Sequence, residues 1–178
     1  MSKKITPFLL LLIVLTSVSC KRDASVNPTN TNSTNNTPVT STTVATNLDN
    51  ALLLKLVNDV RARGCTCGTT VMPAVAPLTW NEMLAKSSLD HSADMKATGI
   101  FTHDSSDGTS FSARITAAGY KWRTVGENIA AGQKTEQQVF TDWLNSEGHC
   151  KNMMNVSFKD MGVARVGDYW TQDFGAVQ

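Results

Sequence analysis

Residues 24–46, ASVNPTNTNSTNNTPVTSTTVAT, contain neither a charged residue nor an aromatic one and are dominated by Ser, Thr, Asn and Pro. A segment of this composition cannot bury enough apolar surface to offset the entropy of ordering its chain. We therefore expect a disordered tether, which as a flexible coil would reach about 25–30 Å. The folded part must then come from residues 47–178, and about 130 residues suit one domain with one core.

The first residues, MSKKITPFLLLLIVLTSVSC, are typical of an export signal. Two lysines precede an apolar stretch at residues 5–15 that is too short for a membrane span. The residues before Cys20 resemble a bacterial lipobox, although Ser17 stands where Leu is usual. We expect removal of residues 1–19 and lipidation of Cys20, which would anchor the protein in a membrane. An ordinary signal peptide with an incidental cysteine is the alternative.

The residue after the cysteine bears on where such an anchor would reside. Lys21 is not the Asp that marks inner-membrane retention in some bacteria. We therefore expect a protein of the cell envelope, on the outer membrane or surface if the host is Gram-negative. The formal net charge is +1, without a basic stripe or interleaved Arg and aromatic residues, so nucleic acid is not an expected partner.

The folded part has the pattern of several helices followed by a hairpin. Apolar residues recur at helical spacing from Leu52 to Val60, and Gly64 follows as a C-terminal glycine. Further helices are expected at residues 81–98 (ending at Gly99), at 111–118 (ending at Gly119) and after the capping box Thr135–Gln138. The tail MGVARVGDYWTQDFGAV alternates around Gly167-Asp168, which predicts a hairpin. Helices with a late antiparallel sheet indicate an α+β or α/β/α layered domain.

Three histidines and one carboxylate are the candidates for chemistry. His91 shares a helical face with apolar residues, so we expect a hydrogen-bonded core group. His103 and His149 are expected in loops, and Glu127 follows a glycine in TVGENIAAGQ. These types suit a divalent-metal site or a small acid/base group. Their spacing matches no compact metal motif, however, and each could equally be an exposed polar residue. Arg114 could pair with a carboxylate that the spacing does not identify.

Six segments occur in an order and spacing that point to a family: HSADM, FTHDSSDG, AAGY, GENIAAGQ, DWLNSEGHCKNMMN and YWTQDFG. Together they resemble the bacterial SCP-like branch of the CAP superfamily (cysteine-rich secretory proteins, antigen 5 and pathogenesis-related proteins). The resemblance runs from about Leu48 to Gly175. It implies that residues 47–178 form a three-layer α–β–α sandwich, with an antiparallel sheet of three or four strands between helices.

The resemblance also implies a cleft lined by two histidines and two acidic residues, where Zn²⁺ or another divalent cation binds weakly. His103 and His149 match the two histidines, and Glu127 matches one acid. Ser146 occupies the other acidic position, with Glu147 beside it. Neighbours on a helix point about 100° apart, so Glu147 can replace that acid only if the helix has already ended. Glu127 would then support the metal ligands or act as a base.

Three cysteines remain besides Cys20. Similar bacterial CAP domains carry CG before the second helix and GHC after the fourth, so the resemblance implies a Cys67–Cys150 bridge. Closing a loop of that length contributes about 4 kcal/mol in the chain-entropy model. Cys65 is then a free thiol. A Cys65–Cys150 bridge stays open as an alternative, whereas Cys65–Cys67 would strain the disulfide geometry.

Two functional hypotheses from different classes follow. The first is an exported, membrane-anchored CAP-domain protein that acts as a binding or interaction module in the cell envelope, for a small ligand, lipid, peptide or cell-wall fragment. The alternative is a metal-dependent hydrolase, peptidase-like or acting on envelope material, with Glu127 as its candidate catalytic residue. An inert structural module is a third reading. No G-x-S-x-G elbow surrounds Ser146, and a fold does not dictate function.

Overall fold

A four-stranded sheet forms the centre of residues 43–178, the part of the chain that the structure, a computed structural model, describes. Its strands, in spatial order, are β3 (Thr79–Trp80), β5 (Asp160–Val166), β6 (Tyr169–Val177) and β4 (Trp122–Ala131). Strands β5, β6 and β4 pair antiparallel, and the short edge strand β3 runs parallel to β5. The long strand β4 forms the other edge, and this position matters for the candidate site.

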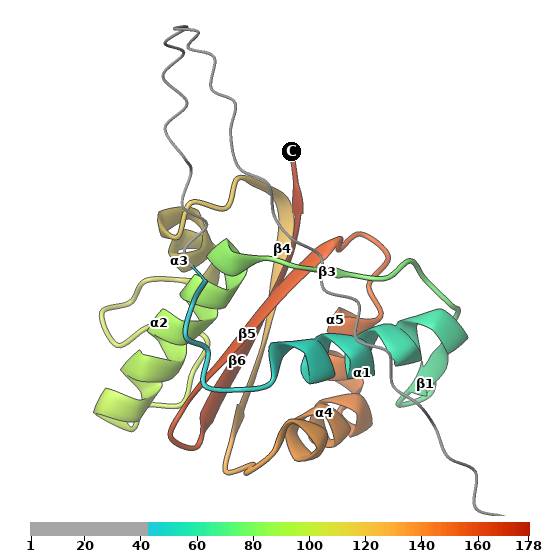
Figure 1. The fold of residues 1–178 in the computed structure, drawn as a ribbon, viewed down its shortest axis with the longest axis horizontal. Coiled ribbons are helices and arrows are strands. Elements are labelled where there is room, and N and C mark those ends of the chain that lie inside the picture. The colour runs from blue at the N-terminus through green and yellow to red at the C-terminus, as the bar shows by residue number, and fades with distance from the viewer. Residues whose placement is uncertain (1–42) are drawn as a thin grey trace, which may run out of the picture. The chain divides into compact units, whose positions relative to one another are not determined.

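Helices cover both faces of the sheet (Figure 1). One face carries α2 (Glu82–Thr98) and α3 (Phe111–Ala117); the other carries α1 (Asn50–Arg63), α4 (Glu136–Asn145) and α5 (Glu147–Met153). A small hairpin, β1 (Cys65–Cys67) and β2 (Thr70–Met72), follows α1. The layered α+β architecture is therefore confirmed. The sheet differs from the expectation in one respect, since β3 makes it mixed rather than wholly antiparallel.

Local sequence sets the helix ends where we expected them. The Asn81 side chain accepts hydrogen bonds at the start of α2, and Gly99 ends that helix in the left-handed conformation with φ 73°. The Thr135 side chain accepts from the Gln138 backbone at the start of α4, and the Gln138 side chain accepts in return from the Lys134 backbone. The predicted capping box is thus present, except that the Gln138 side chain binds the backbone of Lys134 rather than that of the N-cap residue Thr135.

The predicted C-terminal hairpin is also present. Val166 and Tyr169 lie opposite each other, so β5 and β6 are joined by the two residues Gly167 and Asp168. Gly167 has φ 60°, the conformation that such a tight turn requires. The other strands, the short helix α5 and the hairpin β1–β2 had no local signal that we recognised.

The signal peptide, Cys20 and most of the expected tether lie outside the described residues. Residues just before the expected boundary at Asn47 already contact the domain. The Val44 backbone nitrogen donates to Glu82 Oε2 at 2.8 Å, and Thr46 is buried. The boundary itself stays a prediction. Within the described part of the chain, no helix is long and apolar enough to cross a membrane.

Arg61 fastens α1 to the end of α5. Its guanidinium is fully buried and donates to the backbone carbonyls of Ala76, Met153 and Asn155. The Met153 carbonyl lies at the C-terminal end of α5, where a cation is favoured by the helix dipole, and Asn155 follows just beyond that end. Burial lowers the pKa of Arg61 to about 10, and the group therefore remains charged at neutral pH. This contact fixes α5 against the core.

Gly162 marks the closest approach of α2 to the sheet. A Cβ atom there would overlap the backbone of Leu84 and Ala85 in α2. We expect Gly162→Ala to destabilise the domain by about 3 kcal/mol or more, because backbone atoms cannot rotate away as side chains do. Urea unfolding measures the change. The control is Gly148→Ala in α5, where a Cβ meets open space and a gain of up to about 1 kcal/mol is expected. Equal stability of both variants would contradict the close packing.

Candidate functional site

Glu127 lies in the middle of β4 rather than in a loop, directly opposite Asp173 of β6. Directly opposed residues share one face of a sheet, while the next residue along the strand points to the other face. Glu127 and Asp173 therefore face α2 and α3. Their neighbours Asn128 and Gln172 face α5. This alternation divides the site into an acidic half and an amide half.

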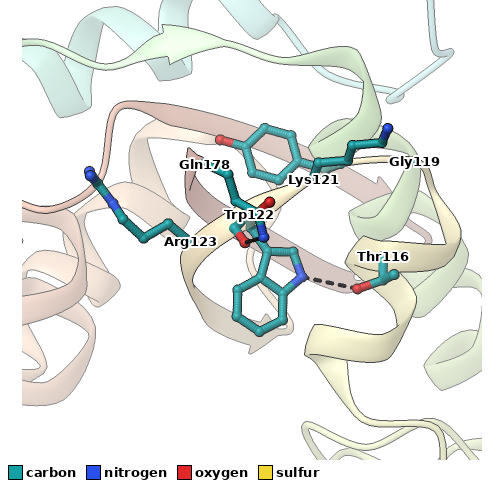
Figure 2. Close-up of a pocket in the computed structure, with 7 residues that line it drawn as sticks. Thr116, Gly119, Lys121, Trp122, Arg123 and Gln178 are labelled. Carbon is teal, nitrogen blue, oxygen red and sulfur yellow. Dashed lines mark hydrogen bonds between the residues drawn. The ribbon is translucent and has the colours of Figure 1, made fainter.

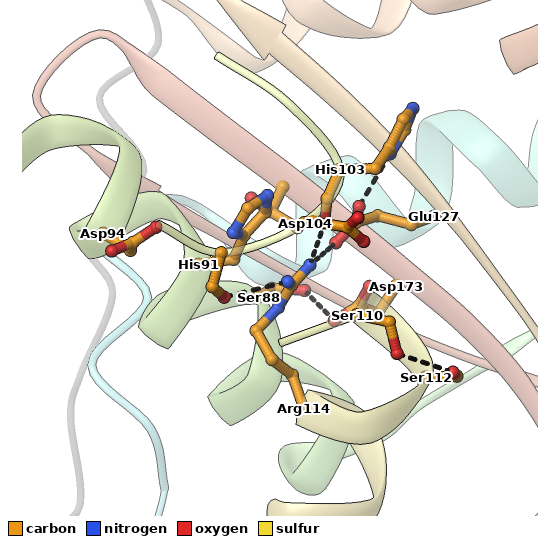
Figure 3. A network of polar contacts seen from close by, with 12 residues as sticks. Ser88, His91, Asp94, His103, Asp104, Ser110, Ser112, Arg114, Glu127 and Asp173 are labelled. Carbon is orange, nitrogen blue, oxygen red and sulfur yellow. Dashed lines mark hydrogen bonds and ion pairs between the residues drawn. The ribbon is translucent and has the colours of Figure 1, made fainter. Parts of the chain in front are cut away.

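The Glu127 carboxylate is buried and fully engaged (Figure 3). Its Oε1 lies 2.7 Å from His103 Nδ1, and its Oε2 accepts from Arg114 Nη2 at 2.6 Å. The Glu127 side chain is 1% exposed and Arg114 is also buried, whereas His103 is 54% exposed. A buried ion pair thus holds the inner edge of a histidine whose outer edge meets solvent.

Arg114 also organises the loop that carries His103. Its Nη2 donates to the His103 carbonyl at 2.9 Å, and its Nη1 donates to Ser105 Oγ and the Thr109 carbonyl, both at 3.0 Å. One side chain of α3 therefore ties the loop to the sheet at three points besides Glu127. Spacing alone did not identify Glu127 as its partner, because 13 residues separate them and only the packing of α3 against β4 brings them together.

His91 fastens the start of the same loop. Its ring is fully buried in α2, and its Nε2 lies 2.9 Å from the Thr102 carbonyl. Burial lowers the pKa of His91, which favours a neutral ring that donates through Nε2. The expectation of a hydrogen-bonded core histidine is confirmed, and the bond to Thr102 fastens the chain directly before His103.

Asp173 is a second acidic residue that sequence reasoning missed. It is fully buried, and Ser88 Oγ of α2 donates to its Oδ2 at 3.2 Å. Burial raises the pKa of Asp173 well above its ordinary value, and the nearby charge of Glu127 raises it further. A signal was available, because a carboxylate within the apolar strand YWTQDFGAV is unusual. The acidic neighbour of Glu127 is therefore a buried one.

His149 lies within α5, whereas we expected it in a loop. The structure places a second helix immediately after α4, with Ser146 between them, and His149 belongs to its first turn. Its carbonyl accepts from Asn128 Nδ2 at 3.2 Å, and Asn152 Nδ2 donates to Asn128 Oδ1 at 2.9 Å. The amide half of the site thus holds α5 beside β4.

The two histidines approach β4 from opposite faces of the sheet, since His103 contacts Glu127 on one face and the His149 carbonyl contacts Asn128 on the other. His103 comes from the loop after α2, and His149 from α5. The hydrogen bond to Glu127 raises the pKa of His103. Burial lowers the pKa of His149, as does the charge of His103.

Ser146 and Glu147 do not join the Glu127 network among the described contacts. Helix α4 does end at Asn145, the condition for Glu147 to replace the expected acid. Glu147 instead pairs with Lys151 at 2.6 Å and is 51% exposed. Its Oε2 would lie 2.6 Å from a Cβ built on Gly68, so the carboxylate faces the turn between β1 and β2.

These contacts limit how a divalent cation would fit at the cleft. Both Glu127 oxygens already accept charged or potentially charged donors, so Glu127 suits the support of a ligand better than ligation. Within residues 43–178, His103, His149 and a carboxylate form no preformed group with ligand atoms within 4.8 Å of one another. The residues that would hold such a cation are the imidazoles of His103 and His149, with water as the further ligands.

The profile of the Cysteine-rich secretory protein family, CAP, matches residues 54–176. The chain belongs to the CAP family. YkwD of Bacillus subtilis (strain 168), an uncharacterized protein, is 44% identical over 100 residues, which are 55% of this chain and 39% of that protein. The chain therefore spans about two fifths of this relative.

Solved structures agree with the family assignment. An extracellular SCP-domain protein from Bacillus anthracis is 31% identical with a TM-score of 0.63, over 70% of this chain and 39% of that one. An outer surface protein from Borrelia burgdorferi is 20% identical with a TM-score of 0.58, over 74% of this chain and 97% of that one. The second likeness concerns the fold alone. Both neighbours are extracellular or surface proteins by description.

A disulfide joins the CAP domain's β1 to α5. Cys67 and Cys150 are bonded, with Cα atoms 5.5 Å apart and a sequence separation of 83. This is the pair that the resemblance implied, and it leaves Cys65 as a free thiol. Because Cys150 follows His149, the bond anchors the helix turn that carries the second cleft histidine.

A separate hollow of about 750 Å³ lies at the start of β4 (Figure 2). Its lining includes Trp122, whose Nε1 donates to Thr116 Oγ1 at 3.0 Å, and the flanking cations Lys121 and Arg123. It shares no residue with the Glu127 network. We assign the candidate site of the CAP domain by the buried polar chemistry around Glu127 rather than by the size of a hollow.

Removal of the Arg114 charge tests how strongly the stability of the fold depends on the buried ion pair. We expect Arg114→Met to lower the free energy of unfolding by about 3–5 kcal/mol, because Glu127 is left buried without its cation. Urea denaturation provides the measurement. Lys151→Met is the matched control, since it breaks an exposed pair and should cost less than about 1 kcal/mol. Similar losses in both variants would contradict the assigned role of Arg114.

The three histidines should titrate in a defined order. NMR should give His103 a pKa above the ordinary histidine value and His149 and His91 values below it. A raised pKa means that the contact of His103 with Glu127 stabilises the fold fully at low pH, and that this contribution is lost as pH rises through the raised value. If His149 retained its proton to higher pH than His103, the assignment of Glu127 as the partner of His103 would be wrong.

Proposed function

We propose that this CAP domain is an exported binding module of the cell envelope, and that His103 and His149 together hold a divalent cation weakly at the edge of β4. The observation that carries the proposal is the engagement of Glu127. Its contact with His103 Nδ1 leaves Nε2, which has no hydrogen bond within the described residues, on the solvent side. A carboxylate behind a histidine is the usual support for a metal ligand.

The chemistry of the donor set suits Zn²⁺ or a similar cation. Two neutral imidazoles and water make a weak and open coordination sphere, in which a bound cation would polarise an oxygen of an incoming ligand. NaASP2, 12% identical with a TM-score of 0.52, has a crystal structure with Zn²⁺. That likeness concerns the fold, so the support for this chain rests on its own histidines.

Binding is better supported than hydrolysis. A carboxylate that acts as a general base must be free to accept a proton within reach of the substrate. Glu127 is occupied by Arg114 and His103, and Asp173 is fully buried behind it. Neither is placed to serve the alternative hypothesis of a metal-dependent hydrolase. The two acids fit a scaffold that holds His103 in one orientation.

The N-terminal segment, residues 1–46, is the basis for the proposed cellular location of the domain. Residues 1–19 would direct export, and lipid on Cys20 would anchor the domain through residues 20–46 to a bacterial membrane. The extracellular and surface neighbours support the export part of this proposal. In that setting, the ligand would be a small ligand, lipid, peptide or cell-wall fragment.

Zinc titration calorimetry tests the cleft. We would titrate the full chain carrying Cys20→Ser, without reductant so that the Cys67–Cys150 bond stays closed, and compare it with a variant that adds His103→Ala and His149→Ala. We expect binding of one Zn²⁺ with micromolar affinity and its loss in the histidine variant. Asp90→Asn, an exposed carboxylate of α2, controls for surface binding and should leave the affinity unchanged. Absence of binding, or binding that survives the histidine changes, would refute the metal-binding cleft.

A further inference from the structure

We propose that Cys65, Cys67 and Cys150 form a second metal site, specific for a thiophilic cation, that becomes available when the Cys67–Cys150 disulfide is reduced. This site is separate from the histidine cleft and uses sulfur alone. Within the described residues, these three are the one group of His, Cys, Asp or Glu whose ligand atoms all lie within 4.8 Å of one another.

The sulfur spacing matches metal coordination. Cys65 Sγ lies 3.7 Å from Cys150 Sγ and 3.8 Å from Cys67 Sγ. A tetrahedral Zn²⁺ with Zn–S bonds of about 2.3 Å places its thiolates about 3.8 Å apart. Cys65, Cys67 and Cys150 place their three sulfurs at the corners of a triangle, and two of its three sulfur–sulfur distances already have this length. The third edge is the covalent disulfide, and on reduction its two sulfurs must separate to ordinary contact distance, which completes the triangle.

The backbone around the cysteines holds the three sulfurs together. Cys65 and Cys67 are two residues apart in β1, so their side chains share one face of the strand. Pairing of Cys65 with Met72 and of Cys67 with Thr70 in β2 fixes that strand. Cys150 comes from α5, whose far end is fastened by Arg61. These restraints do not depend on the disulfide.

Burial provides an enclosed site with one open side. Cys67 and Cys150 are fully buried, whereas Cys65 is partly exposed. A cation could enter past Cys65 and take water as its remaining ligand. Three thiolates select soft d¹⁰ cations such as Zn²⁺ and Cu(I) over Ca²⁺ and Mg²⁺, which prefer oxygen.

The two distances from Cys65 Sγ to the bonded sulfurs also argue against a role for Cys65 in thiol–disulfide exchange. Thiol–disulfide exchange proceeds by attack of a thiolate on one sulfur while the other leaves. Displacement at sulfur requires approach along the axis of the breaking bond. Cys65 Sγ is nearly equidistant from both disulfide sulfurs, so it meets that bond from the side. The triangle suits a shared cation better than a direct displacement.

The proposed reaction has a simple balance. A dithiol reductant gives two electrons and two protons to the Cys67–Cys150 bond, which breaks to two thiols while the reductant closes its own disulfide. A divalent cation then replaces the protons of the three thiols and releases three protons to solvent. The cation takes over the link between β1 and α5 that the disulfide makes in the oxidised protein.

Cobalt spectroscopy tests the site directly. The full chain carrying Cys20→Ser, which leaves only these three cysteines, is reduced with a phosphine because dithiols bind metals themselves. Anaerobic titration with Co²⁺ should give thiolate-to-cobalt charge transfer in the near ultraviolet that saturates at one ion per chain, accompanied by visible bands of tetrahedral cobalt. Zn²⁺ should bleach the charge-transfer band. The unreduced protein, in which His103 and His149 offer only nitrogen, should show no charge-transfer band.

Two variants separate this site from the cleft. Cys65→Ser keeps the disulfide-forming pair but removes one thiolate, and we expect Co²⁺ affinity in the reduced protein to fall at least tenfold. The variant with His103→Ala and His149→Ala should keep the charge-transfer band, since those rings contribute no sulfur. Loss of the cleft site therefore leaves this result unchanged, and the two proposals can fail independently.

Several outcomes would overturn the proposal. They are a reduced protein without charge transfer, a Cys65→Ser variant with undiminished affinity, and a band that needs the cleft histidines. If reduction alone unfolds the chain, Co²⁺ or Zn²⁺ must restore the circular dichroism of the oxidised protein, because binding to an ordered site is coupled to folding. Failure of the metal to restore the fold would equally overturn it.

Discussion

The ion pair between Glu127 and Arg114 is the contact on which the candidate site depends. An ion pair out of contact with water is favourable only when the remaining donors and acceptors are satisfied. Here the guanidinium also binds the loop of His103, and the carboxylate also binds the His103 ring. The loop, the sheet and α3 therefore share one polar centre. A change to either charge would alter where His103 lies, beyond its effect on stability.

The α5 side of the site is held by different chemistry. Helix α5 is short, and helices of that length have little stability of their own. It is fastened by the disulfide at Cys150, by Arg61 at its C-terminal carbonyls and by Asn128 at the His149 carbonyl. A covalent bond, a buried cation and an amide thus fix the second histidine. The two sides meet at β4 because its neighbouring residues Glu127 and Asn128 point to opposite faces, toward α3 and α5.

The contacts of the two acids are the support for proposing recognition rather than reaction. Both acids of the site are used to hold other groups, and the group left facing solvent is an imidazole edge. The CAP fold does not decide function by itself, so the argument rests on these contacts. The proposed cation site at His103 and His149 and the proposed site at Cys65, Cys67 and Cys150 differ in the chemistry they would offer. The first would present nitrogen at a solvent-facing edge, and the second would present sulfur only after a bond is broken.

The sequence by itself determined what depends on neighbours in the chain. Helix ends at Asn81 and Gly99, the capping box of α4 and the turn at Gly167 follow from local hydrogen bonds and backbone freedom. The family motifs pointed to the two cleft histidines, to Glu127 and to the disulfide pair. Only the tertiary structure decided that Glu127 lies in a strand opposite Asp173, that Arg114 is its partner and that Cys65 contacts both bonded sulfurs. These pairings join distant segments or depend on how neighbouring side chains are oriented, so they follow from strand register and layer packing rather than from any pattern within one segment.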